Sequence, residues 1–214
     1  LFRSKIVLNA ENYYRTMISA DDKSWNIRDR HMADTLESIL KVHDNAKAIV
    51  WAHNTHIGDH RFTDMVDQGE VNIGGLGRDM FKDVALIGFG TYKGTVIASN
   101  KWGGKIKTLP VPPGQYGSWD AYFHHICEDL NSKGCVVNFT ELNHDEKKEF
   151  HLKKGQRAIG VVYHPAYEFG NYVPTIIGKR YDAFVFIDET HALDHIDVTA
   201  PDKKEIPHDY PFNA

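Results

Sequence analysis

A cluster of histidines is the feature of this sequence best suited to chemistry. His53, His56 and His60 lie close together, with Asp59 and Arg61 among them. A neutral imidazole can accept or donate a proton near pH 7, which suits a general acid or base. His53 and His56 are three positions apart, so a helical turn would place both on one face. We predict that His53 and His56 are catalytic and that His60 contacts the substrate.

The position of this cluster supports a functional reading. It directly follows residues 47–52, a short apolar run that is expected to form a strand buried on both faces. In open α/β sheets, ligands bind outside the carboxyl ends of the strands. A single histidine is more often a packed, hydrogen-bonded residue, but several polar side chains at one strand exit favour a site.

A metal site is an alternative interpretation of the same residues. His53, His56 and His60 resemble a ligand set, with Asp59 as a fourth ligand. The spacing lacks the glutamate of His-Glu-x-x-His, so no known zinc motif is met. We therefore expect no bound metal and no cofactor.

A second polar cluster lies at the start of an expected helix over residues 27–43. Asp29 suits the N-terminal end of a helix dipole, and Arg28 could hold a carboxylate through a bidentate pair. Tyr163 and Glu168 follow another expected strand and are predicted to line the same crevice. Taken singly, each of these residues more often has a structural role. Together with His60 they form the predicted substrate-binding set.

Length and composition exclude several classes of protein. The 214 residues carry 25 Lys and Arg against 29 Asp and Glu, and the resulting net charge of −4 argues against a nucleic-acid partner. No apolar run approaches the ~18 residues of a membrane span. Cys127 and Cys135 do not make a disulfide framework, so we expect a reduced, cytoplasmic setting. No signal-peptide pattern follows Leu1, and we expect no membrane partner. A Gly-x-Ser-x-Gly motif is missing, which leaves a serine nucleophile without support. Because the first residue is Leu1 and not Met, the chain is expected either to be cut from something longer or to lack its disordered start.

Periodicity predicts alternating helices and strands. The expected helices cover residues 2–19, 27–43, 74–82 and 118–130, and the expected strands cover 47–52, 84–92, 95–99, 135–139, 158–163 and 183–188. This order favours an α/β fold with a central, largely parallel sheet covered by helices on both faces. We predict one domain over residues 1–200 and a loosely ordered tail over residues 201–214.

Three segments resemble the erythromycin esterase family, which includes succinoglycan-biosynthesis-like proteins. They are Trp25-Asn26-Ile27-Arg28-Asp29-Arg30-His31-Met32-Ala33, Val50-Trp51-Ala52-His53-Asn54-Thr55-His56-Ile57-Gly58-Asp59 and Tyr181-Asp182-Ala183-Phe184-Val185-Phe186-Ile187-Asp188-Glu189-Thr190. The resemblance implies an α/β hydrolytic fold that cleaves macrolide lactones with a histidine-activated water and without metal. It also implies that His53 and His56 lie in the active-site cleft and that the partner is a small-molecule ester.

The sequence departs from the family in one respect. The family carries its principal general base in an earlier Gly-Glu-x-x-His segment, which these residues do not contain. The resemblance therefore implies a C-terminal half, with the base upstream of Leu1 and the N-terminal half of the same protein as its partner. These residues alone are then expected to show little esterase activity and to expose an edge strand or an apolar patch. Two other functions remain open: a non-catalytic module that binds a small molecule or carbohydrate, and a metal- or haem-binding protein.

Overall fold

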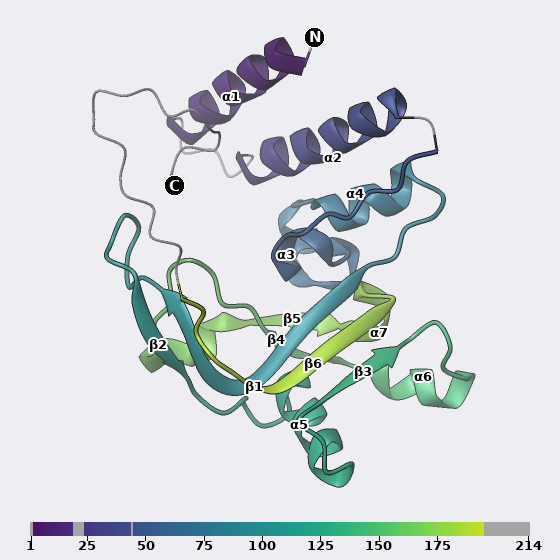
Figure 1. Ribbon diagram of the computed structural model, residues 1–214, viewed down its shortest axis with the longest axis vertical. Helices are drawn as coiled ribbons and strands as arrows, with labels where there is room; N and C mark the ends of the chain where they lie inside the picture. Colours follow the sequence, from purple (N-terminus) through teal and green to yellow (C-terminus); the bar gives the residue numbers. More distant parts are fainter. Residues whose placement is uncertain (1, 19–23, 44, 195–214) are drawn as a thin grey trace.

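The computed structural model describes residues 2–18, 24–43 and 45–194 (Figure 1). The expected tail over residues 201–214 lies outside the described residues. The elements, in chain order, are α1 (Phe2–Ile18), α2 (Ser24–Val42), α3 (Asn54–Ile57), η1 (His60–Phe62), η2 (Asp64–Gln68), α4 (Ile73–Met80), β1 (Ile87–Ala98), β2 (Lys107–Val111), α5 (Trp119–Asp129), β3 (Gly134–Asn138), α6 (His144–Phe150), β4 (Lys153–Arg157), η3 (Pro165–Asn171), β5 (Tyr172–Ile176), α7 (Ile177–Arg180) and β6 (Ala183–Thr190).

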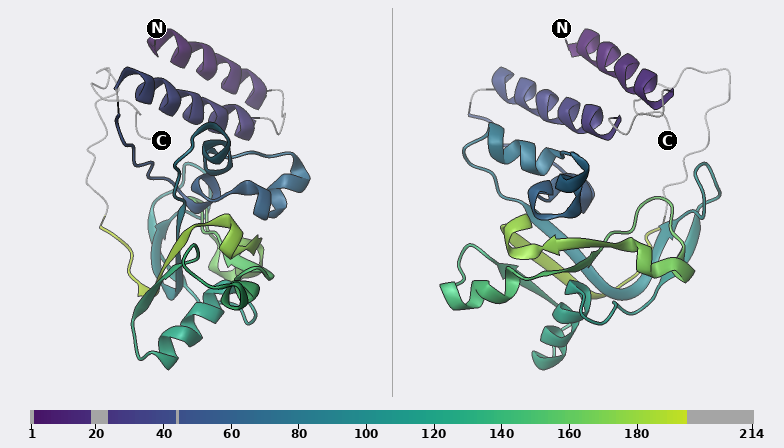
Figure 2. Two further views of the ribbon diagram at one scale, coloured as in Figure 1. Left: turned by 90° about the vertical axis from the view of Figure 1, so that its right-hand side faces the viewer. Right: turned by 180° about the vertical axis from the view of Figure 1, so that it is seen from behind.

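The first two helices form a hairpin beyond one end of the sheet. α1 and α2 pack side by side, and α2 also contacts α4 (Figures 1 and 2). Both helices were predicted, but α2 begins at Ser24 and not near Ile27. Asp29 is therefore a buried helical residue and not a residue at the helix start. None of the described helices is long and apolar enough to span a membrane.

The fold is α/β, as predicted, but the sheet is mostly antiparallel. The four strands lie in the order β2-β1-β6-β3, and only the central pair, β1 and β6, is parallel. β2 and β3 each run antiparallel to their neighbour. β4 and β5 form a separate antiparallel pair. The predicted largely parallel sheet is wrong because β2 returns directly beside β1, and β3 pairs with a strand from much later in the chain. The order of helices and strands in a sequence does not give strand direction.

Four predicted strands also differ from the structure. Residues 47–52 form no strand, and Ile49 and Trp51 are 94% and 86% exposed. An apolar run indicates a tendency to be buried, but it does not determine whether the segment forms a strand or which part of the fold covers it. The predicted hairpin turn at residues 93–94 lies instead inside the continuous strand β1. There Gly94 adopts φ 137°, where an added Cβ would collide with the carbonyl oxygen of Thr190. Residues 158–163 contribute only an isolated bridge, between Ser99 and Val162.

The hydrophobic core lies between α5 and one face of the sheet. The Phe123 ring of α5 stacks on Phe184 and Phe186 of β6, with centroid distances of 5.0 and 5.5 Å. All three side chains are essentially buried. Ser118 caps α5 by accepting a hydrogen bond from the Ala121 N–H at 3.1 Å. Burial of three phenylalanine side chains contributes roughly 1.5–3 kcal/mol each, which fixes α5 on this face.

The opposite face of the sheet has no such cover among the described residues. Ile87 and Phe89 of β1 are 47% and 42% exposed, Ile187 of β6 is 44% exposed, and Val136 of β3 is 69% exposed. We call these four side chains the open face. Helices on both faces were predicted, and that prediction is wrong for the described part of the chain. The apolar patch expected from the sequence is present.

A buried carboxylate connects α5 to β4. Asp120 is 2% exposed and accepts a hydrogen bond from the Arg157 N–H at 2.9 Å. Burial raises the pKa of Asp120 to about 6. The Arg157 N–H and guanidinium oppose this rise, and the negative charge of Glu168 adds to it. The folded state thus binds this proton more tightly than the unfolded chain, whose aspartate pKa is close to 3.8.

We expect Asp120→Asn to have a larger free energy of unfolding, relative to the wild-type protein, at pH 7.5 than at pH 4.5. The folded pKa lies above the unfolded one, so the wild-type protein loses stability as the pH rises from about 4 to about 6. The full pKa difference corresponds to roughly 3 kcal/mol, of which about 2 kcal/mol is lost between pH 4.5 and pH 7.5. An amide, which does not ionise, escapes this loss. Urea unfolding of both proteins at the two pH values measures the effect. Asp129→Asn, at the exposed end of α5, is the control. An identical advantage of Asp120→Asn at both pH values would contradict this account.

Candidate active site

A buried carboxylate holds one of the two histidines that were predicted to be catalytic. Asp29 is completely buried, and both of its carboxylate oxygens lie 2.9 Å from Nδ1 of His56. A carboxylate only accepts hydrogen bonds, so Nδ1 carries the proton and Nε2 keeps its lone pair. The Ile73 N–H also donates to Asp29, at 3.0 Å, which ties α2 to α4. His56 can therefore accept a proton at Nε2, and Asp29 would stabilise the resulting imidazolium.

Two more side chains of α2 surround His56. The Trp25 indole stacks on the imidazole, with centroids 4.4 Å apart and planes 6° from parallel. Nη2 of the exposed Arg28 lies 3.3 Å from Nε2 of His56 and can donate to it. The structure thus brings together three of the predicted residues, Arg28, Asp29 and His56. Trp25 was not predicted, although its spacing of four from Asp29 places both on one helix face.

His53 begins the helical turn that carries His56. It is the N-cap of α3, and its Nδ1 accepts a hydrogen bond from the Thr55 N–H at 3.3 Å, so its proton lies on Nε2. Burial by the surrounding protein lowers the pKa of His53. A hydrogen bond with the Ile159 backbone opposes this effect, whereas the charges of His56 and Arg180 lower the pKa further. The lowered pKa of His53 favours the neutral form of its imidazole.

The turn itself is held by two residues that sequence reasoning missed. The Asn54 side chain accepts from the Phe89 N–H at 3.1 Å and donates to the Phe89 carbonyl at 2.6 Å, which fastens α3 to β1. Beneath it, Arg180 is 1% exposed and donates to the Asn54 carbonyl at 3.1 Å. Its other guanidinium bonds go to the neutral oxygens of Gln156 and Thr175. Among the described residues no carboxylate pairs with Arg180, so its positive charge acts on the site above it.

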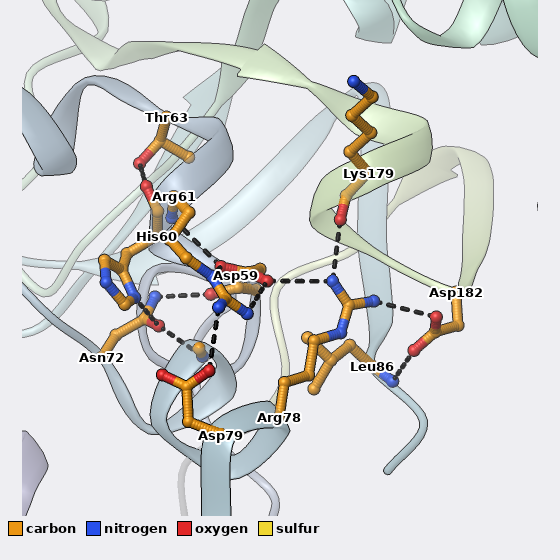
Figure 3. A network of polar contacts seen from close by, with 12 residues as sticks. Asp59, His60, Arg61, Thr63, Asn72, Arg78, Asp79, Leu86, Lys179 and Asp182 are labelled. Carbon is orange, nitrogen blue, oxygen red and sulfur yellow. Dashed lines mark hydrogen bonds and ion pairs between the residues drawn. The ribbon is translucent and has the colours of Figure 1, made fainter.

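His60 does not join His53 and His56. It is 7% exposed, and its Nδ1 lies 3.2 Å from Oδ1 of Asn72 (Figure 3). The Asn72 amide donates to the carbonyls of Thr55 and Gly58, at 2.7 and 2.5 Å. A Cβ at Gly75 would collide with the His60 ring, which shows how closely α4 packs there. His60 therefore supports the turn from below through Asn72, and its predicted contact with substrate stays a prediction.

A network of charged side chains lies beside His60 (Figure 3). Asp59 is completely buried and pairs with Arg61 at 2.8 Å and with Arg78 at 3.0 Å. Arg78 also pairs with Asp182 at 2.8 Å. Asp182 in turn accepts from the Leu86 N–H at 2.7 Å, just before β1. The network joins the histidine segment, α4 and the start of β6, and so holds the site to the sheet.

Tyr163 and Glu168 form a separate cluster. Tyr163 is 1% exposed, and its hydroxyl donates to Glu168 at 2.6 Å. The other carboxylate oxygen of Glu168 accepts from Nε of Arg157 at 2.5 Å. Within the described part of the chain, no hydrogen bond or ion pair joins this cluster to His53 or His56. Both oxygens of Glu168 are already engaged, so the structure does not bring the pair into the histidine site.

The arrangement is typical of an α/β protein that handles protons with histidine. One imidazole is oriented by a buried carboxylate and lies on the same helical turn as a second imidazole, beside an exposed guanidinium. Among the residues that the structure describes, no three His, Cys, Asp or Glu side chains are grouped to hold a metal ion. The profile of the erythromycin esterase family matches residues 3–190. The chain belongs to that family, which confirms the resemblance found in the sequence.

Three solved structures share the fold. A Bacillus cereus protein is 19% identical, with a TM-score of 0.64 over 79% of this chain and 40% of its own. A succinoglycan biosynthesis protein is 21% identical, with a TM-score of 0.60 over 78% of this chain and 39% of its own. An erythromycin esterase, EreC, solved as a mutant in an open conformation, is 16% identical, with a TM-score of 0.54 over 83% of this chain and 41% of its own. This chain thus matches about two fifths of each.

Proposed function

We propose that this chain is part of a hydrolase that cleaves carboxylic esters, with macrolide lactones as the substrate class. The pair formed by Asp29 and His56 carries the proposal, because it fixes the tautomer and orientation of an imidazole in the way that hydrolases require. Membership of the erythromycin esterase family supports the choice of ester and of a histidine-activated water.

Each residue of the site has a role in this proposal. Water attacks the ester carbonyl carbon, the acyl–oxygen bond breaks, and the alcohol oxygen receives the proton that water lost. The principal base that takes this proton belongs to a part of the family fold outside these residues. His56, whose charged form Asp29 stabilises, and neutral His53 polarise the carbonyl and stabilise charge on the tetrahedral intermediate. Arg28, exposed beside Nε2 of His56, binds the carboxylate that forms.

The test compares turnover by these 214 residues with turnover by the complete gene product. Both are assayed against a macrolide and against p-nitrophenyl acetate. We expect the complete product to hydrolyse ester and the isolated residues to be slower by about a hundredfold or more, because members of a catalytic unit act non-additively.

Two other results would change the assignment. Comparable turnover by the isolated residues would show that the base lies within them, with His53, His56 and His60 as candidates. If neither protein hydrolyses either ester, the hydrolase proposal fails. Macrolide binding without turnover, measured by calorimetry, would then identify a binding module.

A further inference from the structure

Arg180, the last residue of α7, holds the histidine turn at both of its ends. Its Nη2 donates to the carbonyl of Asn54, the first residue of α3, at 3.1 Å. Its own carbonyl accepts from the Asp59 N–H, just past the end of α3, at 3.0 Å. The turn between these two contacts carries His56, and His53 is its N-cap. Arg180 therefore fixes both histidines against α7.

The side chain of Arg180 is enclosed by protein. It is 1% exposed, and it packs so closely against the turn that a Cβ added to Gly58 would lie 2.5 Å from its Nε. Its Nη1 donates to side-chain oxygens of Gln156 and Thr175, at 3.0 and 2.9 Å. Any effect of Arg180 on a ligand is therefore transmitted through the turn or through its charge.

The charge of Arg180 is not neutralised by a carboxylate. In the described part of the chain its hydrogen bonds go only to uncharged oxygens, and its Nε has no acceptor. Charges interact more strongly inside a protein than in water, because the effective dielectric constant is lower. The effect reaches His53, whose pKa is lowered first by burial and then further by the charges of His56 and Arg180.

Positive charge exceeds negative charge around the two imidazoles. Arg28 places a second guanidinium there, with Nη2 3.3 Å from Nε2 of His56. Its Cζ lies 4.9 Å from the centroid of the Trp25 ring, and no carboxylate pairs with it among the described residues. The carboxylate of Asp29 has both oxygens on Nδ1 of His56. Two guanidinium charges against one carboxylate give a site that attracts an anion.

We propose that Arg180 is a positioning residue that makes the histidine site receptive to an anion: it holds the turn that carries the two imidazoles, and its unpaired charge strengthens the binding of a carboxylate at Arg28. The choice of a carboxylate rests on the proposed ester hydrolysis, which forms one, whereas the excess of positive charge does not depend on that reaction. The same charge favours the negative oxygen of the tetrahedral intermediate.

Acetate binding tests the proposal without an ester. The complete gene product, with 13C-labelled histidine, is titrated with acetate at pH 7 and constant ionic strength. NMR follows the Cε1–H resonances of His53 and His56, and we expect both to shift to saturation. Arg28→Gln should weaken acetate binding about tenfold, because a charge-assisted hydrogen bond is lost. Arg30→Gln, also exposed on α2, is the matched control and should bind acetate as the wild type does.

Two substitutions of Arg180 separate its charge from its hydrogen bonds. Arg180→Met removes the charge and should weaken acetate binding about threefold or more. It should also move the titration of His53 to higher pH, because one of the charges that oppose protonation is lost. Arg180→Lys keeps the charge and should change acetate binding less than about twofold. If Arg180 only held the turn, the lysine variant would be as impaired as the methionine variant, since an ammonium cannot reproduce the guanidinium's hydrogen bonds.

Each other result overturns part of the proposal. If no resonance shifts to saturation in the wild-type protein, the site does not bind a carboxylate. Equal losses in Arg180→Met and Arg180→Lys show that the charge has no role, and unchanged binding in both shows that Arg180 does not act on the ligand. Circular dichroism checks each fold, and Arg180→Gln replaces Arg180→Met if the latter does not fold. Inorganic phosphate that binds at least tenfold more tightly than acetate would contradict the choice of a carboxylate.

The titration also separates this proposal from the esterase proposal. A complete product that binds acetate with the expected dependence on Arg28 and Arg180 but hydrolyses no ester keeps the anion site, and the esterase proposal fails by itself. A product that hydrolyses ester without any acetate-dependent shift keeps the esterase proposal and overturns this one.

Discussion

His56→Ala should lower ester turnover by the complete gene product by about a hundredfold or more. The substitution removes the imidazole that Asp29 orients and leaves a buried carboxylate without its partner. Asp29→Asn should have a comparable effect, because an amide can hold the imidazole in the wrong tautomer. The double variant should be little slower than either single variant, since the two residues act as one unit.

Steady-state kinetics on the three variants measure these effects, with circular dichroism to check the fold. His125→Ala is the matched control, because this histidine lies on α5 with 67% of its side chain exposed. If His56→Ala retains turnover within a fewfold of the wild type while folded, His56 is not part of the catalytic machinery. In that case its contact with Asp29 only joins α2 to α3.

Asp59→Asn should lower the free energy of unfolding by about 3 kcal/mol, because it removes one partner of a buried charge network. Arg61 and Arg78 would lose their shared carboxylate. Within the described part of the chain, Arg61 would keep its pair with Asp79 and Arg78 its pair with Asp182. Burial acts to raise the pKa of Asp59, but the hydrogen bonds and charges of the two arginines outweigh it and lower the pKa. The stabilisation is therefore present at neutral pH and is lost as the pH falls through the folded-state pKa.

Urea unfolding at pH 7 measures the loss in Asp59→Asn. Asp79→Asn is the control, because Asp79 pairs with the same arginine but has 59% of its side chain exposed. An exposed pair of this kind contributes about 0–1 kcal/mol. Equal losses in the two variants would show that burial of Asp59 adds nothing to the network.

The elements with a clear periodic pattern were predictable. α5 follows from apolar residues on one side and from Ser118 at its start, and both depend only on neighbours within a few positions. β6 follows from a short apolar run, and its Phe184 and Phe186 are indeed core residues. The family was predictable from three short segments, because residue types at fixed spacings can be recognised in the sequence without the structure.

Part of the site was also predictable, through its residue types. His53, His56, Arg28 and Asp29 stood out as polar side chains next to expected elements. The sequence did not show that Asp29 is the partner of His56. The two residues come from separate helices and meet only when α2 packs beside α3 and α4. Arg180 gave no signal, since a lone arginine far along the chain is ordinarily a surface residue.

The sequence by itself determined the histidine cluster, the succession of helices and strands, and the family signature. These features depend on residue chemistry and local periodicity, which are properties of neighbouring residues. Strand direction, the contact of His60 with Asn72 and the grouping of Tyr163 and Arg157 around Glu168 depend on contacts between distant segments. Such contacts are selected by the packing of the whole fold, because a side chain becomes buried or exposed only when another segment covers it or leaves it open. The open face shows this most directly, since its apolar residues match those of the core and differ only in having no cover among the described residues.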